Sequence, residues 1–195
     1  PQLWDACRFV VDRSNKDGLF ILTGSTRLKK KNLVSHTGTG RVGRIKMRPM
    51  SLWESGESSG CISLGQLFKE PFKAGAAKQW SLSEIFYLVC RGGWPKAIDK
   101  SERAALKQAY NYVDAIATTD INDVDDVSRS EANTRRLLRS YARLQGSQAP
   151  VSTIITDLEA NNEGKLSDTT IASYLKALRG LFVVEDMEAW NPNLR

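Results

Sequence analysis

In the first fifty residues, segments whose apolar side chains have helical spacing alternate with short segments that have the pattern of strands. Apolar side chains at helical spacing predict an amphipathic helix that ends at the turn cluster 15–18. Residues 19–22 form a continuous apolar run, which is typical of a strand buried on both faces of a parallel sheet. Residues 26–35 favour a second helix, and residues 42–47 alternate as a second strand. This helix–strand–helix–strand order predicts an α/β layer.

The middle of the chain carries two helix-start signals. Ser51 and Ser81 are each followed three residues later by a glutamate, the spacing of a capping box. We therefore expect a short helix after Ser51 and another over 85–90, which the segment 91–95 stops. Residues 54–65 are rich in serine and glycine and indicate an exposed loop, and a longer helix is expected over 101–117.

The last sixty residues have the pattern of three short helices and a strand. The first helix is expected over 133–144, and the second contains Val151, Ile154 and Leu158. Ser167 caps the third helix, and residues 181–185 are typical of a strand. Three helices followed by a strand predict a winged helix-turn-helix.

Charge is distributed unevenly along the 195 residues. The chain has 28 Lys and Arg against 22 Asp and Glu, a net charge of +6, yet residues 18–53 contain no acid. A second basic group lies at 135–143, and the acidic stretch 114–131 separates the two. Two basic surfaces divided by an acidic segment indicate two modules that each face an anion.

Cysteine and histidine content narrows the class of protein. Cys7, Cys61 and Cys90 are odd in number and far apart, which argues against a disulfide framework and favours a reducing cytoplasm. The single His36 argues against a zinc site of the usual kind. No apolar run reaches the roughly 20 residues of a membrane span, so no membrane contact is expected. The first residue, Pro1, fits a processed or truncated product.

Three motif matches fail in their sequence context. Residues 56–60 fit G-x-S-x-G, but the elbow of a hydrolase needs a preceding strand and a later histidine. Residues 38–43 fit G-x-G-x-x-G, but they leave a helix and enter a strand, the reverse of a dinucleotide loop. The aspartates between 120 and 126 lack calcium-loop spacing.

Polar residues at the end of the first predicted strand are the candidate nucleotide contacts. Thr23 and Ser25 follow the apolar run, and ligands of open α/β sheets bind at the carboxyl ends of strands. Arg41 and Arg44 precede the second strand, and an arginine there can reach a triphosphate on a neighbouring subunit. There is an alternative without nucleotide chemistry. Thr23 and Ser25 would then form an ordinary turn, and Arg41 and Arg44 would be surface arginines without a fixed partner.

The order of these pieces resembles the prokaryotic AAA-superfamily ATP-binding proteins that carry a C-terminal domain of unknown function. The resemblance rests on 20–25, 40–47, 49–54, 91–95 and the winged helix. It implies a partial nucleotide-binding core at 1–70, a helical lid or connector at 71–130, and a winged helix-turn-helix at 131–195. It also implies Thr23 or Ser25 as the polar sensor, Arg44 as a nucleotide contact, and Arg41 as the arginine finger of a homo-oligomer.

Two departures from that family are visible. No G-x-x-x-x-G-K-[ST] phosphate loop occurs, and no strand that ends in paired acids precedes Pro1. The resemblance therefore implies a fragment whose intact parent binds and hydrolyses ATP with Mg²⁺, while this chain alone is inactive.

Two further functions compete with this interpretation. Arg135, Arg139 and Arg143 share one helix face, which suits a phosphate backbone, so the chain could be a DNA-binding regulator. The third helix would then present Thr169, Thr170, Ser173 and Lys176, a set that is poor in base-reading side chains. The other alternative is an interaction scaffold without nucleotide chemistry.

Overall fold

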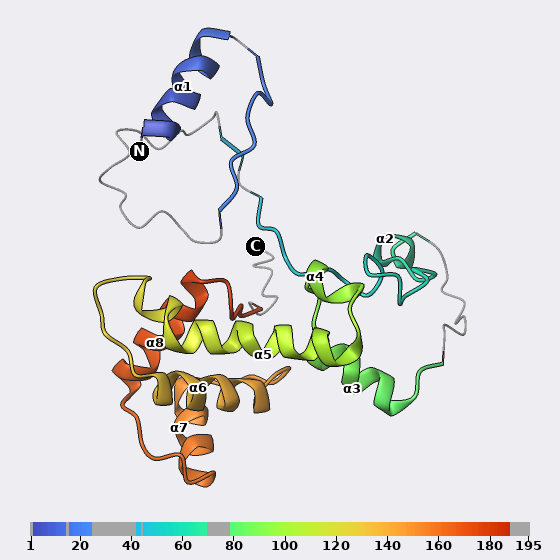
Figure 1. The fold of residues 1–195 in the computed structure, drawn as a ribbon. Coiled ribbons are helices and arrows are strands. Elements are labelled where there is room, and N and C mark those ends of the chain that lie inside the picture. The colour runs from blue at the N-terminus through green and yellow to red at the C-terminus, as the bar shows by residue number, and fades with distance from the viewer. Residues whose placement is uncertain (1, 15, 25–41, 44, 70–78, 188–195) are drawn as a thin grey trace, which may run out of the picture. The chain divides into compact units, whose positions relative to one another are not determined.

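The computed structural model describes residues 2–14, 16–24, 42–43, 45–69 and 79–187 (Figure 1). These residues form helices and no β-strand. The chain divides into two compact units, residues 1–43 with 115–195 and residues 44–114. The elements are α1 (Gln2–Ser14), α2 (Leu64–Leu67), α3 (Leu82–Arg91), α4 (Pro95–Ile98), α5 (Glu102–Thr118), the 3₁₀ turn η2 (Asp120–Asn122), α6 (Glu131–Arg143), α7 (Val151–Ala160) and α8 (Asp168–Gly180).

The predicted α/β layer is wrong. Residues 19–24 and 45–49 belong to no helix or strand, and they lie exposed to solvent. Ile21 is 90% exposed and Ile45 is 95% exposed, so neither run is buried on two faces. An apolar run specifies a strand only where a partner strand takes its backbone hydrogen bonds, and the described part of the chain provides none.

The first unit contains a helical core built by its last three helices. α7 packs against both α6 and α8, and α8 also packs against η2. These elements, the last turn of α5 and the residues after α8 contribute a core of fully or almost fully buried apolar side chains, which are Ile116, Ile121, Leu137, Ile154, Leu158, Ile171, Leu175, Leu178 and Val184. The three predicted C-terminal helices are confirmed, with Ser167 accepting a hydrogen bond from the Thr170 amide as the cap of α8.

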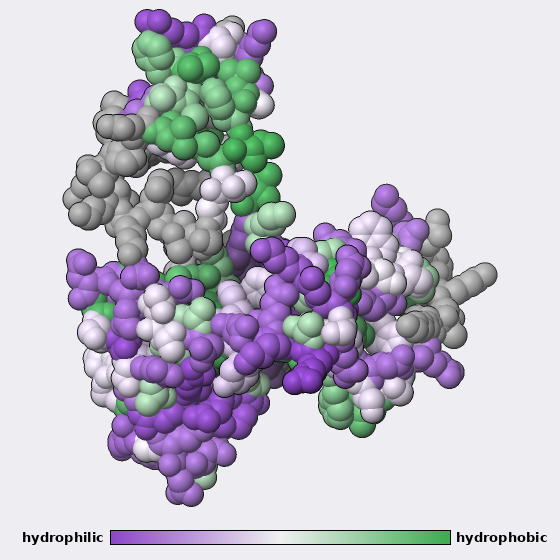
Figure 2. All heavy atoms as spheres, in the orientation of Figure 1, coloured by the Kyte–Doolittle hydropathy of each residue, from purple (hydrophilic) through white to green (hydrophobic). Residues whose placement is uncertain are grey.

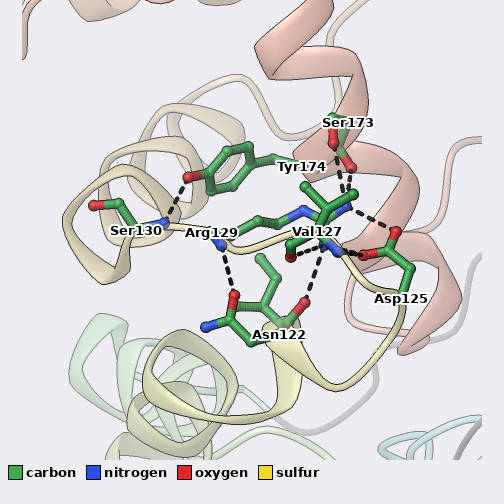
Figure 3. Close-up of polar contacts among 8 residues, drawn as sticks. Asn122, Asp125, Val127, Arg129, Ser130, Ser173 and Tyr174 are labelled. Atoms are coloured by element: carbon green, nitrogen blue, oxygen red, sulfur yellow. Dashed lines mark hydrogen bonds and ion pairs between the residues drawn. The ribbon is translucent and has the colours of Figure 1, made fainter.

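A buried arginine ties the loop before α6 to α8 (Figure 3). Arg129 is 5% exposed, and its guanidinium donates to both carboxylate oxygens of Asp125 at 2.6 and 2.9 Å. The same group donates to Ser173 Oγ at 3.1 Å and to the carbonyl of Ile121 at 3.2 Å.

The backbone of this loop is held by two further side chains. Asn122 Oδ1 accepts from the Arg129 amide at 2.6 Å, and Tyr174 Oη accepts from the Ser130 amide at 2.8 Å. Because a polar backbone group inside a protein must be hydrogen-bonded, these two side chains allow an irregular loop to lie against the core.

The predicted strand at 181–185 is also wrong. The chain turns directly after α8, where Phe182 has a φ of 59° and the Val183 amide donates to the carbonyl of Leu178 at 3.0 Å. Val184 is then buried in the core. Asp186 accepts hydrogen bonds from Tyr141 on α6 and from Arg179 on α8, which holds this tail between two helices. Among the described residues, which end at 187, no strand follows the three helices as the predicted wing.

The second unit is organised around the C-terminal end of α3. The capping box predicted at Ser81 is present, because Ser81 and Glu84 each accept from the other's backbone amide. Ser51 and Glu54 make the same pair of hydrogen bonds, but the residues that follow form turns instead of the expected helix. The predicted helix over 101–117 is confirmed as α5.

A close backbone contact joins residue 50 to the end of α3. The Met50 amide donates to the Gly93 carbonyl at 2.8 Å, and a Cβ on Gly93 would lie 2.2 Å from the Met50 carbonyl oxygen. Gly92 adopts φ 69° and ψ −174°, a conformation essentially restricted to glycine. Both glycines of the segment 91–95 are therefore required by backbone geometry.

We expect Arg129→Met to lower the free energy of unfolding by roughly 3 kcal/mol, the lower end of the cost of breaking a buried ion pair, because Asp125 remains partly exposed. The matched control is Arg135→Met, which removes a helix-surface i,i+4 pair with Glu131 and costs under about 0.5 kcal/mol. Urea unfolding followed by circular dichroism measures both, and equal losses would contradict the role given to Arg129.

Tyr141 provides a second test of the packing around the C-terminal tail. Burial, together with the hydrogen bond to Asp186, raises the pKa of Tyr141 from 10.0 to about 12. Since the folded state favours the neutral phenol, this contribution to stability is complete below pH 10 and is lost as pH rises through about 12. The ultraviolet titration of Tyr141→Phe, subtracted from that of wild type, should show a phenol that ionises near pH 12. Asp186→Asn should move the pKa of this phenol toward 10. A wild-type difference titration with its midpoint already near pH 10 would refute the packing of Tyr141 against the C-terminal tail.

Candidate interaction surface

The predicted nucleotide contacts do not assemble into a site among the described residues. Thr23 is exposed and lies outside any helix or strand. Ser25, Arg41 and Arg44 lie outside the described residues. The described residues also contain no group of three or more acidic, histidine or cysteine side chains that could hold a metal ion.

The arginine face of α6 is paired with carboxylates of the same unit. Arg135 Nε lies 2.8 Å from Glu131, and Arg139 Nε lies 3.4 Å from Glu163. Arg143 donates from Nε and Nη2 to Asp157 on α7 at 2.7–3.1 Å, and its Nη2 lies 3.5 Å from Glu163.

These ion pairs change the electrostatics of the face. The hydrogen bond from Arg143 holds the pKa of Asp157 below its ordinary value of 3.8, so the carboxylate is charged at neutral pH. Arg136, which lies between Arg135 and Arg139 in the sequence, donates to the Glu163 carbonyl and to Asn133. Three arginines therefore join α6 to α7 and the loop that follows, and much of their charge is compensated before any phosphate approaches.

The outer residues of α8 have structural partners as well. Thr169 and Thr170 lie 3.0 and 2.8 Å from Ser167 Oγ, within the cap of the helix. Ser173 accepts from Arg129, while Lys176 is exposed. The hydrogen bond from Arg129 lowers the pKa of Asp125, and the charge of Lys176 adds a smaller effect in the same direction. The connection between α7 and α8 spans residues 161–167, which is longer than the 3–4-residue turn of a helix-turn-helix.

The described surface carries a different feature, an apolar face along α3. Leu82, Ile85, Phe86 and Val89 repeat at i, i+3, i+4 and i+7, and they are 64%, 40%, 60% and 75% exposed. Figure 2 shows hydrophobic atoms gathered where Figure 1 places this helix. The sequence shows the spacing of these residues in a capped helix, but it does not show that their side chains are exposed to solvent.

A groove continues this face. It encloses ≈ 310 Å³ and is lined mainly by apolar side chains, which are Met50, Leu52, Trp80, Ile85, Leu88 and Val89. Ile85 and Val89 belong to both the groove and the exposed face, so the two form one apolar surface.

A buried ion pair fixes the helix that carries this surface. The Arg91 side chain is 4% exposed, and its guanidinium pairs with Glu57 and donates to the Gly92 carbonyl at 3.1 Å. The hydrogen bond from Arg91 also lowers the pKa of Glu57. The 51–60 loop, which contains the rejected hydrolase motif, is thereby attached to the last turn of α3. Sequence reasoning missed this pair because its members are separated by 34 residues and lie in a loop and a helix.

Comparisons with known proteins identify a family for more than half of the chain. Residues 82–195 match a family described as a domain of unknown function (DUF8612), and the chain belongs to that family. No curated protein and no solved structure matches the chain.

The resemblance to AAA-superfamily ATP-binding proteins is therefore wrong. The family found is one of unknown function, and the described residues form helices without the strands of an α/β nucleotide-binding core. The expected binding of ATP and Mg²⁺ and the expected oligomer with an arginine finger were implied by that resemblance alone. They therefore have no remaining support. The boundaries at 70/71 and 130/131 stay a prediction.

The family region differs from the rest of the chain in charge. Residues 82–195 contain 14 Lys and Arg against 16 Asp and Glu, a net charge of −2, whereas residues 1–81 have a net charge of +8. A DNA-binding domain normally presents an excess of positive charge. DNA binding through Arg135, Arg139 and Arg143 stays a prediction, and the pairing of these side chains defines a test of it.

We expect Asp157→Asn combined with Glu163→Gln to strengthen binding of duplex DNA at low salt by about tenfold, because the variant frees arginine charges for phosphates. A salt titration should also become steeper, by roughly one unit of slope for each arginine released. Glu159→Gln is the control, since Glu159 pairs with Lys165 and with none of these arginines. Equal affinities and slopes for all three proteins would rule out a DNA-binding role for this face.

Proposed function

We propose that this chain is a protein-interaction module, and that α3 binds an amphipathic helix of a partner protein. The observation that carries the proposal is the exposed i, i+3, i+4, i+7 face of Leu82, Ile85, Phe86 and Val89, continuous with an apolar groove. Helix-in-groove recognition uses this spacing, with the apolar side chains of one helix placed in the groove of another protein.

The energetics favour a partner that covers the face. Burial of a large apolar side chain stabilises by about 1.5–3 kcal/mol relative to leaving it exposed, and four such side chains lie in one row. Contiguous apolar patches on a surface usually mark binding sites. Because the capping box and the buried Arg91–Glu57 pair hold α3 at both ends, little conformational entropy is lost when the partner binds.

Charge and cysteine chemistry support the same function. Because the arginines of α6 are paired within their own unit, that helix presents less free positive charge to a partner than its sequence suggests. Cys7, Cys61 and Cys90 are all free thiols, which supports a reducing compartment such as the cytoplasm as the place of action. In the part of the chain that the structure describes, no helix has the length and apolarity that a membrane crossing requires.

The test compares the proteins retained by the wild-type chain with those retained by Phe86→Asp combined with Val89→Asp. Both positions are exposed, so the variant should fold normally by circular dichroism. Ser83→Asp is the matched control, since it adds a charge to an exposed position of the same helix away from the apolar face. Quantitative mass spectrometry should show proteins that wild type and Ser83→Asp retain at least about tenfold better than the double variant. If all three chains retain the same proteins equally, α3 is not a binding surface.

A further inference from the structure

The 51–60 loop is closed by contacts between its own residues. The Ser58 amide donates a hydrogen bond to the Leu52 carbonyl at 2.8 Å. The Trp53 ring lies so close to Gly60 that a Cβ added there would come within 2.5 Å of the ring. Compact surface loops whose ends lie close together are packed by their own side chains. The loop can therefore keep its shape without the help of α3.

Polar contacts hold this loop against the last turn of α3. Arg91 pairs with Glu57, and its Nη2 lies 3.5 Å from Ser55 Oγ. The Met50 amide, just before the loop, donates to the Gly93 carbonyl at 2.8 Å. No residue of the loop is buried. Because a segment with few buried apolar contacts opens at a lower free energy than the core, these polar contacts decide whether the loop is docked.

The docked loop supplies one side of the groove beside α3. Met50 and Leu52 line this groove together with Ile85, Leu88 and Val89 of α3. If the loop leaves the last turn of α3, its apolar side chains leave the groove with it, and the helix face remains as an open surface.

Docking does not cover the exposed row of α3. Leu82, Phe86 and Val89 are 64%, 60% and 75% exposed while the loop is docked. The loop therefore adds an apolar wall next to this row and does not block it. A partner helix that contacts both α3 and the wall buries more apolar area than a helix on α3 alone, and it binds more tightly.

We infer that the 51–60 loop is a hinged wall of the α3 surface, and that the Arg91–Glu57 pair docks it to complete the site for a partner helix. This role of the loop rests on the proposed function of α3. The family match begins at Leu82, so the wall comes from residues outside the matched region. The site is thus composite, with its floor on α3 and its wall on the preceding loop.

Native-state hydrogen exchange of the full chain tests the docking without any partner. Glu57→Gln removes the charge that pairs with Arg91, so the Met50 amide should exchange about tenfold faster or more. The Ser58 amide, which is bonded within the loop, should keep its wild-type rate because the loop undocks as one body. Glu102→Gln removes a charge from an exposed position of α5 and is the control that should change neither rate.

Three results of this experiment would overturn the inference. An unchanged Met50 amide in Glu57→Gln would show that the ion pair does not dock the loop. Equal acceleration of the Met50 and Ser58 amides would show that the loop melts instead of moving on a hinge. A Met50 amide that exchanges at the rate of a free chain in wild type would show that the loop is not docked in solution.

The retained proteins separate this inference from the proposed function. Among the proteins that wild type retains and that Phe86→Asp with Val89→Asp loses, Glu57→Gln should retain about fivefold less. If Glu57→Gln retains them as well as wild type or better, the loop is not part of the site, and the inference fails while the proposed function stands. If no proteins depend on α3, the proposed function fails and the inference fails with it, whatever the exchange rates are.

Discussion

The C-terminal helical core depends on one buried arginine. Arg129 lies in an irregular loop, yet its guanidinium reaches Asp125 in that loop, the carbonyl of Ile121 and the side chain of Ser173 on α8. A guanidinium has five donors in a fixed planar arrangement, so one side chain can satisfy acceptors from three elements. Without it, the loop between η2 and α6 would bring unpaired carbonyl groups against the core, and α8 would lose its attachment to that loop.

Local features of the fold could be predicted from the sequence, and contacts between distant residues could not. The cap at Ser167, the capping box at Ser81 and the helix over 101–117 depend on neighbouring residues, and all three are present. The strands at 19–22 and 181–185 were predicted from apolar runs alone, but a strand also requires a partner that no local pattern reports. The Arg91–Glu57 pair likewise joins residues far apart in sequence.

The arginines of α6 show why residue type alone did not identify a site. A stripe at 135, 139 and 143 has the spacing of a phosphate-binding face, and the sequence gives no sign that Asp157 and Glu163 meet it. The structure assigns these side chains to the packing of α6 against α7. The apolar residues of α3 are the opposite case, because their spacing suggests a helix that packs in the core. Their exposure in the structure is what distinguishes them as a surface for a partner.

Native-state hydrogen exchange tests the central claim about Arg129 most directly. The amides of Arg129 and Ser130 lie outside any helix, but they donate to Asn122 and Tyr174. If the buried network holds this loop, these two amides exchange as slowly as those in the middle of α8, through global unfolding. Exchange at the rate of a free loop, while α8 remains protected, would show that the loop opens independently and that Arg129 does not hold the core together.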